Sequence, residues 1–352
     1  MIKSSYNVVG VMSGTSLDGI DLVHVNFEYN KDWTFNIIHA ETIEYSQKWF
    51  DTLKELVSSS FEELKQIDKD YTIYLADIIN NFIVKNKIEN LDAVCSHGHT
   101  ALHQPEKKLT YQIGNLSIIA EILKQTVVCD FRPEDVNLGG QGAPLVPIGD
   151  ALLFSNYHYC LNLGGFANIS YNEEGKRIAY DICPVNIVLN KYAEQLGYKY
   201  DAGGKIAATG TYISSLANKL EALPFYKQKA PKSLGLEWVN KNIFPLIEAS
   251  NLPVKDVLNT FSNHIAQEIA RVIKKDSRVL ITGGGAYNDY LISRIKKSKS
   301  MEIVIPNKYL LEFKEALIFA FLGILKLRNE VNCLQSVTGA SRDHSSGKIY
   351  KV

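Results

Sequence analysis

Apolar residues recur along the chain with two spacings, that of a β-strand and that of an α-helix. These spacings predict a similar succession of elements in both halves. An apolar run over residues 6–12 and an alternating stretch over 22–28 predict two strands joined by a turn. Apolar residues at helical spacing predict a long amphipathic helix over residues 61–87. Asn115 is expected to cap a short helix that runs to residue 124. Further strands are predicted at residues 35–45, 91–96 and 126–130.

The second half follows residues 131–147, an irregular stretch rich in Gly and Pro that we interpret as a functional loop near the domain boundary. Strands are predicted at residues 159–162, 167–171, 177–181, 279–282 and 301–305. Helices are predicted at residues 184–196, 211–222, 236–249, 253–275, 289–297 and 310–329. Hairpins mixed with crossover helices predict an α/β fold with a mixed sheet in each half. We expect an N-terminal domain at 1–130, completed by the tail 335–352, and a C-terminal domain at 131–334.

Composition narrows the class of protein. The chain has 352 residues, is 46% hydrophobic, and carries 38 Lys plus Arg against 38 Asp plus Glu. Zero net charge argues against a basic nucleic-acid binder and against an acidic disordered protein. Five scattered cysteines without a CxxC pair argue against a disulfide framework and a structural zinc site. No apolar run is long enough to cross a membrane, and no secretory signal is visible, so we expect a cytoplasmic location.

The first chemistry-bearing motif extends from Gly10 in the first strand through the following turn to Asp21. Its candidate residues for binding a nucleotide phosphate are Gly14, Thr15, Ser16, Asp18, Gly19 and Asp21. Glycines let backbone N–H groups approach an anion closely, and the two hydroxyls add donors. Asp18 and Asp21 could hold a hydrated Mg²⁺ ion. The alternative is an ordinary hairpin turn.

Two further glycine motifs occur in the second half. Gly164 and Gly165, followed by Asn168, repeat the plan of strand, glycine turn and strand. This repetition suggests an internal duplication with two loops that grip one phosphate chain. Gly283, Gly284 and Gly285 lie between a strand and a helix, followed by Asn288, and would let an adenosine lie against the backbone. The alternative is a tight strand–helix turn.

In this order, the three motifs resemble those of the sugar kinase/Hsp70/actin ATPase superfamily. Longer matches narrow the resemblance to the anhydro-N-acetylmuramic acid kinases. They are the segments 14–21 (GTSLDGID), 96–98 (SHG), 112–115 (QIGN), 130–132 (DFR), 139–145 (GGQGAPL), 162–165 (NLGG), 231–233 (PKS), 283–286 (GGGA) and 314–316 (KEA). The resemblance extends roughly from residue 8 to residue 341.

The resemblance implies a two-domain, actin-like (ribonuclease H-like) ATPase fold with ATP in the interdomain cleft. It implies an ATP- and Mg²⁺-dependent transferase that phosphorylates O6 of 1,6-anhydro-N-acetylmuramic acid and opens the anhydro ring by hydrolysis. Such a kinase serves peptidoglycan recycling in the cell wall. The resemblance also implies a homodimer with a small sugar substrate as its partner, and neither a nucleic acid nor a membrane.

The catalytic base implied by the resemblance is Asp181, in a segment where the family has a Phe-Asp-Thr-Gly-Pro-Gly-Asn pattern. Here Asp181, Pro184 and Asn186 match, whereas Cys183 and Val185 replace the two glycines. The replacements question how this loop passes the phosphates. From the residues alone, Asp181 could equally be the N-cap of the helix expected at Pro184.

The remaining site residues follow from the same resemblance. Arg132 could bind a lactyl carboxylate bidentately, or form a surface ion pair with Glu134 or Asp135. Glu315 could be a second carboxylate of the active site, or a favourable charge at a helix N-terminus. The other expected sugar contacts are His97, Gln112, Asn115, Gly140, Gln141, Gly142 and Pro144. A metal site at His97, His99 and His103 is disfavoured because no ligand at zinc-like spacing completes it.

Three other functions stay open at this point, the weakest of them a degenerate sugar-binding pseudokinase, which rests on the two lost glycines. The altered residues Cys183 and Val185 leave room for a kinase of the same fold that acts on another amino sugar or a small carboxylic acid. A nucleotide-gated protein of the actin or Hsp70 kind is a second alternative. Against it, the sequence has no additional peptide-binding domain.

Overall fold

The computed structural model describes residues 3–352 and divides the chain into two compact units. Unit 1 comprises the chain up to Leu153 together with Phe313–Val352, and unit 2 comprises Phe154–Glu312. Unit 1 therefore extends beyond residue 130, where the boundary was expected. Its C-terminal part begins at residue 313 and not at residue 335. Packing explains the difference, because Gly149 contacts Ile318 and thereby joins residues 131–153 to the C-terminal segment.

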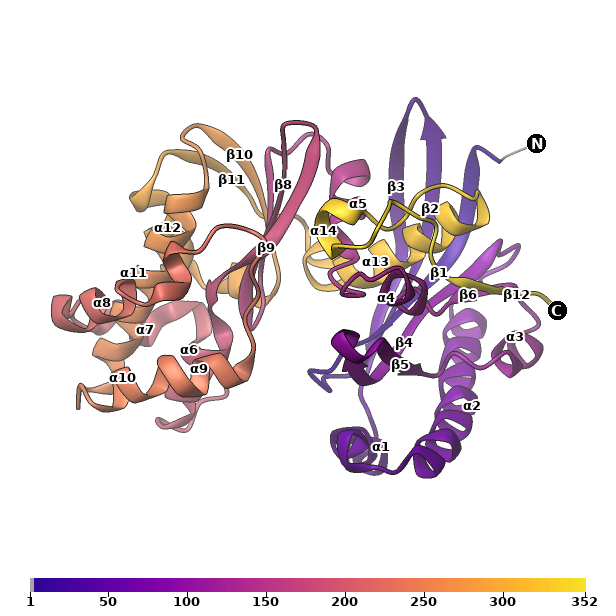
Figure 1. Cartoon of the computed structure of the whole chain (residues 1–352), viewed down its shortest axis with the longest axis horizontal. Coiled ribbons are helices and arrows are strands. Elements are labelled where there is room, and N and C mark those ends of the chain that lie inside the picture. Colours follow the sequence, from indigo (N-terminus) through magenta and orange to yellow (C-terminus); the bar gives the residue numbers. More distant parts are fainter. Residues whose placement is uncertain (1–2) are drawn as a thin grey trace. The chain divides into compact units, whose positions relative to one another are not determined.

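Both units contain strands and helices, and each has three consecutive strands, β1–β3 and β7–β9 (Figure 1). The strands are β1 (Ser5–Ser13), β2 (Ile20–Asn30), β3 (Asp32–Ile43), β4 (Ala93–Gln104), β5 (Leu109–Ile113), β6 (Val127–Cys129), β7 (Tyr159–Leu163), β8 (Phe166–Glu173), β9 (Lys176–Pro184), β10 (Ser277–Thr282), β11 (Met301–Val304) and β12 (Lys348–Tyr350). The α-helices are α1 (Gln47–Lys54), α2 (Phe61–Lys85), α3 (Ile118–Leu123), α4 (Pro133–Asn137), α5 (Val146–Leu153), α6 (Asn186–Glu194), α7 (Lys205–Thr209), α8 (Ser214–Glu221), α9 (Leu236–Asn242), α10 (Phe244–Glu248), α11 (Val254–Val272), α12 (Asp289–Ser298), α13 (Lys308–Leu327) and α14 (Gln335–Thr338). Short 3₁₀ turns are η1 (Leu56–Ser58), η2 (Pro105–Lys107), η3 (Ala202–Gly204), η4 (Pro224–Lys227) and η5 (Gly284–Tyr287).

Both sheets are mixed and follow one plan. In unit 1 the strand order is β12-β6-β4-β1-β2-β3, with β5 paired to β4, and in unit 2 it is β11-β10-β7-β8-β9. Each sheet has a three-stranded antiparallel meander whose first strand also pairs in parallel with a later one, β4 beside β1 and β10 beside β7. The expected mixed α/β architecture is confirmed, and the shared strand order supports the internal duplication inferred from the two glycine turns.

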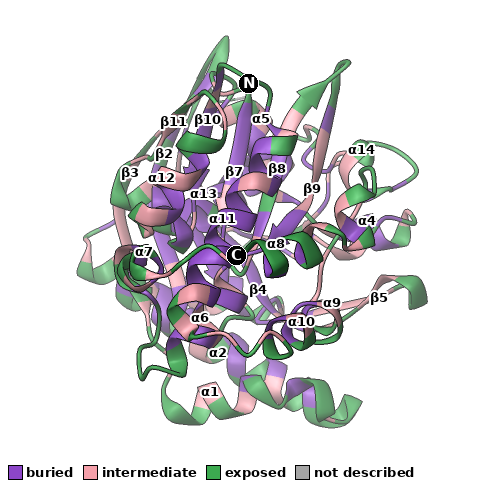
Figure 2. Ribbon diagram, turned by 90° about the vertical axis from the view of Figure 1, so that its left-hand side faces the viewer, coloured by how far each residue is buried: buried purple, intermediate pink, exposed green. Residues whose placement is uncertain are grey.

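The sheet of unit 1 is covered on both faces. Val9 and Val11 of β1 pack in one core with the buried side of α2, while Gly10 between them faces α13. The side chains of a strand point alternately to opposite faces, so one strand contributes to both layers. Ser60 begins α2 with a capping box to Glu63. In unit 2, α11 packs against α6, α8 and α12, and strands β7 and β10 are mostly buried (buried residues are purple in Figure 2).

Three local predictions are wrong. Asn115 caps no helix: α3 begins after Ser117, and the Asn115 side chain instead bonds to the carbonyl oxygen of His97 and to Asp130. The helix expected over 236–249 is two short helices, α9 and α10, with a Pro at the start of the second. The stretch expected to be irregular, 131–147, contains α4.

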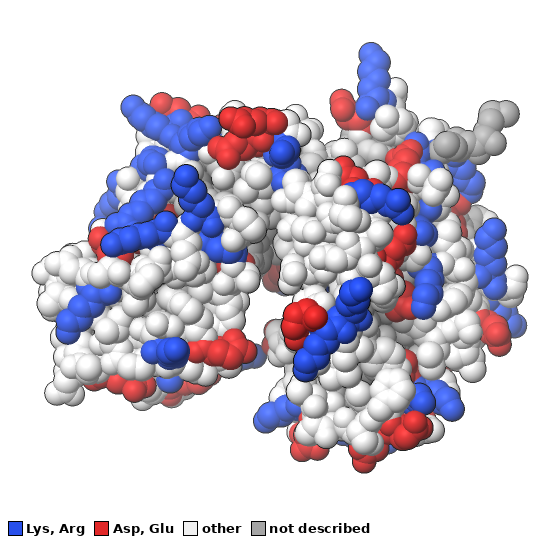
Figure 3. Space-filling model, viewed as in Figure 1, with Lys and Arg blue, Asp and Glu red and all other residues white. Residues whose placement is uncertain are grey.

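Acidic and basic side chains both lie on the surface, and the five cysteines lie in the interior. Lys and Arg side chains are interspersed with Asp and Glu on the face drawn in Figure 3. All five cysteines are free and buried. Within residues 3–352, no helix combines the length and the apolar character that crossing a bilayer requires.

Candidate functional site

A row of polar side chains crosses four strands of unit 2 and ends at Asp181. The strand register places Thr282 beside Asn162, Asn162 beside Asn168, and Asn168 beside Asp181. The Thr282 hydroxyl donates to Asn162 (3.4 Å), whose amide donates to Asn168 (3.5 Å), whose amide in turn donates to Asp181. Each donor therefore points toward the carboxylate, and the row fixes its orientation.

The second oxygen of Asp181 is held from a distant part of the sequence. The backbone N–H of Leu234 donates to Asp181 Oδ2 (2.7 Å), and the Asp181 N–H donates to the Lys232 carbonyl oxygen (3.1 Å). Lys232 is itself anchored, because its ammonium donates to the Phe225 carbonyl oxygen and lies 4.5 Å from the centre of the Phe225 ring. Burial raises the pKa of Asp181, although the bonds from Leu234 and Asn168 oppose the shift. A half-buried carboxylate with a raised pKa is suited to accept a proton.

Asp181 is not at the end of a strand, so the N-cap interpretation is wrong. Strand β9 continues to Pro184, and α6 begins only at Asn186. Asn168 pairs with Asp181 whereas Ala167 pairs with Cys183, so Ile182 is an extra residue that forms a β-bulge. Bulges redirect side chains and are frequent beside active sites.

The two residues that replace family glycines lie inside unit 2. Cys183 and Val185 are completely buried in its hydrophobic core. Burial raises the pKa of the Cys183 thiol well above its usual value, which argues against a nucleophilic role. Because both side chains point into the core, neither narrows the outer face of the loop, where a phosphate chain would pass.

Removal of the Asn168 side chain should leave the Asp181 carboxylate less firmly oriented. We expect Asn168→Ala to lower kcat about tenfold, which corresponds to one lost hydrogen bond to a charged group of roughly 1.4 kcal/mol. Because the Asn168 donor lowers the pKa of Asp181, its loss raises that pKa and moves the acid limb of the pH–rate profile to higher pH. Asn172→Ala on the same strand is the matched control. An unchanged acid limb in Asn168→Ala would show that the row does not tune Asp181.

The glycines in the turns of unit 2 are of two kinds: some have no room for a side chain, and others do. A Cβ on Gly283 would lie 2.6 Å from Asn162 Oδ1, and one on Gly285 would lie 2.7 Å from Leu163 Cβ. Packing alone therefore requires these two glycines. Gly284 and Gly165 are exposed and have no such close contact. The remaining expected nucleotide contacts here are Gly164, which is half-buried, and Asn288, whose side chain caps α12.

The turn of unit 1 shows the same separation. Gly19 is buried with φ +149°, and a Cβ there would lie 2.6 Å from the Ile43 carbonyl oxygen. Gly14 has open space, and the neighbouring Thr15 and Ser16 are exposed. The exposed part of the turn thus offers backbone and hydroxyl donors.

The two acidic residues proposed for Mg²⁺ differ in their surroundings. Asp18 is exposed, whereas Asp21 is half-buried on β2 and accepts a hydrogen bond from the Thr42 hydroxyl (2.6 Å). Mg²⁺ usually keeps several waters and one or two carboxylates beside substrate phosphates. Asp18 fits that role better than Asp21, because its carboxylate is open to water.

A hydrogen-bonded group under the unit 1 turn was missed by the sequence reasoning. The Ser13 hydroxyl contacts the hydroxyls of Tyr45 (2.6 Å) and Tyr71 (2.7 Å) and the Nδ1 atom of His99 (3.1 Å). Burial lowers the pKa of His99 to about 4, so the ring is neutral at pH 7. The group ties the base of the turn to α2 and β4.

Arg132, which is half-buried, pairs with the buried His97 in unit 1. Arg132 Nε donates to His97 Nε2 (2.8 Å), and Arg132 Nη1 donates to the Gly142 carbonyl oxygen (2.6 Å). His97 Nδ1 in turn lies 2.8 Å from the Gly98 carbonyl oxygen and donates to it. Burial, followed by the charge of Arg132, holds the pKa of His97 well below its usual value. The surface ion pair considered for Arg132 is therefore replaced by contacts that leave Nη2 available to an acid.

Two buried aspartates, which sequence reasoning did not select, build the predicted sugar-binding segments. Asp68 of α2 accepts from the Gly114 N–H (2.7 Å) and the Tyr111 hydroxyl (2.6 Å). Asp135 accepts from the Gly142 N–H (2.7 Å), and its own carbonyl oxygen accepts from the Gly140 N–H (2.9 Å). Asp68 could have been noticed in the sequence, because it lies on the buried face of the predicted helix.

The other predicted sugar contacts are divided between buried and exposed positions. Gln112 and Asn115 are buried, and Gln112 Oε1 and Asn115 Oδ1 have no hydrogen-bond partner in the described part of the chain. Gln141 and Pro144 are exposed. Glu315 reaches solvent on α13, yet the surrounding protein raises the pKa of its carboxyl, opposed by the charges of Arg132 and Lys314. Hydrogen bonds thus connect four of the predicted sugar contacts, His97, Asn115, Arg132 and Gly142. Gln141 and Pro144 lie near this group because they are close to Gly142 in the sequence.

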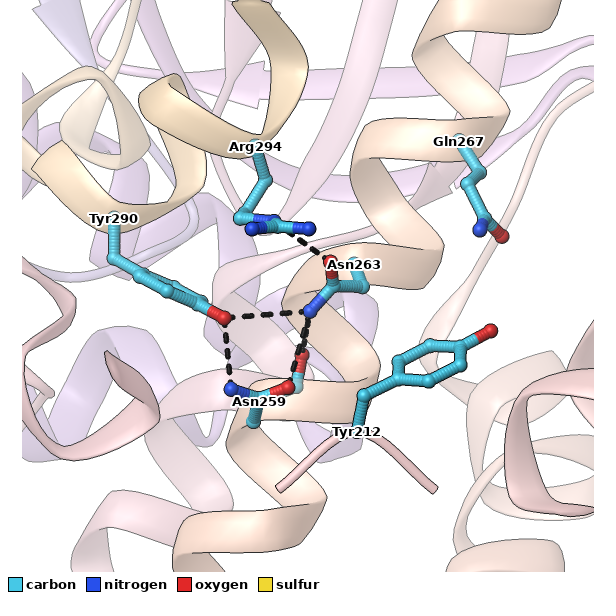
Figure 4. A pocket seen from close by; sticks show the side chains of 6 residues that line it. All are labelled: Tyr212, Asn259, Asn263, Gln267, Tyr290 and Arg294. Atoms are coloured by element: carbon cyan, nitrogen blue, oxygen red, sulfur yellow. Dashed lines mark hydrogen bonds between the residues drawn. The ribbon is translucent and has the colours of Figure 1, made fainter. Parts of the chain in front are cut away.

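A polar pocket of about 420 Å³ lies between α11 and α12 in unit 2 (Figure 4). Asn259 and Asn263 of α11 bond to the Tyr290 hydroxyl of α12 (2.7 and 3.4 Å), and Arg294 donates to Asn263 (2.7 Å). Asn259 also donates to the Ala207 carbonyl oxygen (2.9 Å). Since α12 follows the triple-glycine turn directly, this network fixes the helix that carries the turn.

This chain is similar to several known proteins. The family described as anhydro-N-acetylmuramic acid kinase matches residues 6–352. An anhydro-N-acetylmuramic acid kinase from Mannheimia succiniciproducens is 34% identical over 99% of this chain and 100% of its own length. Those from Hydrogenovibrio crunogenus (32% identical, 97% of both chains) and Saccharophagus degradans (33%, 97% of this chain and 98% of the relative) are similar as well. A solved structure, the activator of a 2-hydroxyisocaproyl-CoA dehydratase from Clostridium difficile with bound ADPNP, covers 92% of this chain and 96% of its own with a TM-score of 0.46 at 12% identity. The chain belongs to the anhydro-N-acetylmuramic acid kinase family.

Proposed function

We propose that the protein phosphorylates O6 of 1,6-anhydro-N-acetylmuramic acid with ATP and opens the anhydro ring with water, giving N-acetylmuramic acid 6-phosphate and ADP. The observation that carries this proposal is the carboxylate of Asp181, which has a raised pKa and is held on both oxygens. Family membership favours the sugar kinase over a nucleotide-gated binding protein. The product would enter peptidoglycan recycling.

Asp181 acts as the general base in this reaction. It takes a proton from a water whose oxygen bonds to the anomeric carbon, while the bond from that carbon to O6 breaks. O6 leaves with the electron pair and attacks the γ-phosphorus, and the bond from that phosphorus to the β–γ bridging oxygen breaks to release ADP. The two steps are coupled, because the oxygen that leaves the anomeric carbon is the one that accepts the phosphoryl group.

The phosphates are expected at the open positions of the glycine turns. Gly14, Thr15 and Ser16 in unit 1, and Gly165 in unit 2, offer exposed backbone and hydroxyl donors. Phosphoryl transfer depends mainly on positioning and on neutralisation of charge. Mg²⁺, which Asp18 would hold through water, supplies that neutralisation.

Arg132 is proposed to bind the lactyl carboxylate of the sugar. The two bonds from Arg132 to His97 and Gly142 orient its guanidinium, and a lysine cannot make both bonds and also reach an acid. We expect Arg132→Lys to raise KM for the anhydro sugar about 10- to 100-fold with a smaller change in kcat. Arg278→Lys, on the surface of unit 2, is the control. An unchanged KM in Arg132→Lys would remove Arg132 from the sugar site.

The test of the function is ADP release from ATP and Mg²⁺, with and without 1,6-anhydro-N-acetylmuramic acid. We expect ADP only with the sugar, and a product that carries both a phosphate and a free reducing end. Equal or faster turnover of an open-chain hexosamine would favour a related sugar kinase instead. ATP hydrolysis without any sugar, accompanied by assembly, would favour a nucleotide-gated protein.

We further propose that the protein works in the cytoplasm as a homodimer. The family resemblance supports the dimer, and membership in a family of metabolic sugar kinases supports the location. Light scattering on the eluting protein would detect a dimer as a doubling of the 39.4 kDa chain mass.

A further inference from the structure

Three side chains with metal-binding atoms meet in the interior of unit 1, outside the proposed catalytic groups. They are Asp135, Cys333 and His344, all buried, and one potential ligand atom from each lies within 4.8 Å of the other two. Asp135 has no exposed surface, and His344 is 6% exposed. The residues are far apart in sequence, and the backbone bonds between Cys333 and His344 (3.1 Å in both directions) bring the last two together. Spacing along the sequence therefore gave no sign of this set.

One ring nitrogen of His344 lacks a hydrogen-bond partner. His344 Nδ1 lies 3.1 Å from the Arg342 carbonyl oxygen and donates to it, so a neutral ring has its lone pair on Nε2. His344 Nε2 is buried, has no hydrogen bond, and lies 3.5 Å from Asp135 Oδ1. A lone pair facing a carboxylate oxygen is unfavourable unless a proton on Nε2 or a bound cation lies between them. The Nδ1–H bond to a carbonyl oxygen is also the usual support for a metal-binding histidine.

The distances and the chemistry of the set suit zinc. Zn–N and Zn–O bonds of roughly 2.0–2.1 Å in a tetrahedron place the two ligand atoms about 3.3–3.4 Å apart, close to the separation of His344 and Asp135. A thiolate, an imidazole and a carboxylate are ligands that zinc accepts together. The carboxylate is already oriented, because its oxygens accept from the Thr338 hydroxyl (2.7 Å) and the Gly142 N–H (2.7 Å).

We propose that Asp135, Cys333 and His344 bind one Zn²⁺ ion per chain, with water as the fourth ligand. On binding, Cys333 releases its thiol proton to solvent, and thiolate and carboxylate together neutralise the two positive charges. Arg132 is near enough for its charge to act on Cys333, and it retains Glu315 as a counter-charge. The ion would join the C-terminal tail to Asp135, which in turn holds the loop around Gly142. The proposal does not depend on the kinase reaction.

Cobalt substitution tests the site directly. Tag-free protein freed of metal with a chelator is titrated with Co²⁺, and absorption is recorded. We expect one equivalent to produce the visible bands of tetrahedral Co²⁺ and a near-ultraviolet thiolate-to-cobalt band, and one equivalent of Zn²⁺ to remove both. Zn²⁺ at 100 times its dissociation constant should also stabilise the fold by about 2.7 kcal/mol, visible as a higher Tm.

Variants identify the ligands. Cys333→Ser should lose the near-ultraviolet band, and His344→Gln should lose binding and the Zn²⁺-induced rise in Tm. Cys129→Ser, a buried cysteine of unit 1 outside the cluster, is the control and should retain both. If Cys333→Ser does not fold, His344→Gln decides alone. Absence of a one-to-one spectrum in the unmodified chain, or its persistence in His344→Gln, would overturn the proposal.

Discussion

Asp181→Asn should lower kcat at least about 10³-fold while ATP binding is retained. A general base contributes roughly 10²–10⁴-fold, and here the same proton transfer also releases the oxygen that accepts the phosphoryl group. The amide is nearly isosteric with the carboxylate, and its oxygen can still accept from the Leu234 N–H. Turnover measured with saturating sugar, together with calorimetric titration of ATP, separates chemistry from binding.

The control for this variant is Asp276→Asn, which changes a carboxylate of unit 2 that bonds to the Ser300 hydroxyl, outside the polar row. It should leave turnover unchanged. The pH–rate profile gives a second readout: the base works when ionised, so the rate falls as pH decreases through the pKa of Asp181. Because burial raises that pKa, the acid limb should lie above pH 3.8. Asp181→Asn with near-normal turnover would reject Asp181 as the base.

The proposed base, Asp181, could be chosen from the sequence, but the groups that hold its carboxylate could not. Asp181 was selected through a short motif that survives in part. Its partner Leu234 is 53 residues away, and the backbone bond between them reports nothing about side-chain type. The bulge at Ile182 was equally hidden, because a local pattern of apolar residues does not reveal which strand will pair with which residue. The alternative N-cap interpretation of Asp181 was wrong because β9 continues beyond Asp181 to Pro184.

The glycines show a second limit of sequence reasoning. A glycine required by close packing and a glycine required by a ligand look identical in the sequence. Gly14 and Gly284 are open, whereas Gly19 and Gly283 have no room for a side chain beside neighbouring backbone. Only the packed structure distinguishes the two kinds, because the atoms that crowd a glycine come from other strands and helices.

Gly10 provides the sharpest test of this distinction, since it stands at the start of the first phosphate motif yet faces a helix. A Cβ on Gly10 would lie 2.2 Å from the Ala316 carbonyl oxygen and 2.8 Å from Ala320 Cβ, both in α13. Backbone cannot rotate away as a side chain can, so α13 must move from the sheet. We expect Gly10→Ala to destabilise unit 1 by about 3 kcal/mol, which lowers Tm by roughly 6–12 °C.

The matched variant is Gly14→Ala, four residues further along the same motif. Its Cβ would meet the Ser16 hydroxyl oxygen at 3.6 Å, an ordinary contact, so the Tm should stay unchanged. If Gly14 lies against a phosphate, the added methyl group should instead raise KM for ATP about tenfold, or roughly 1.4 kcal/mol. Thermal melting and ATP kinetics on both variants therefore give opposite patterns. An unchanged Tm in Gly10→Ala would show that the close contact between α13 and β1 does not stabilise unit 1. The packing of α2 on the other face of the sheet would then be the main source of its stability.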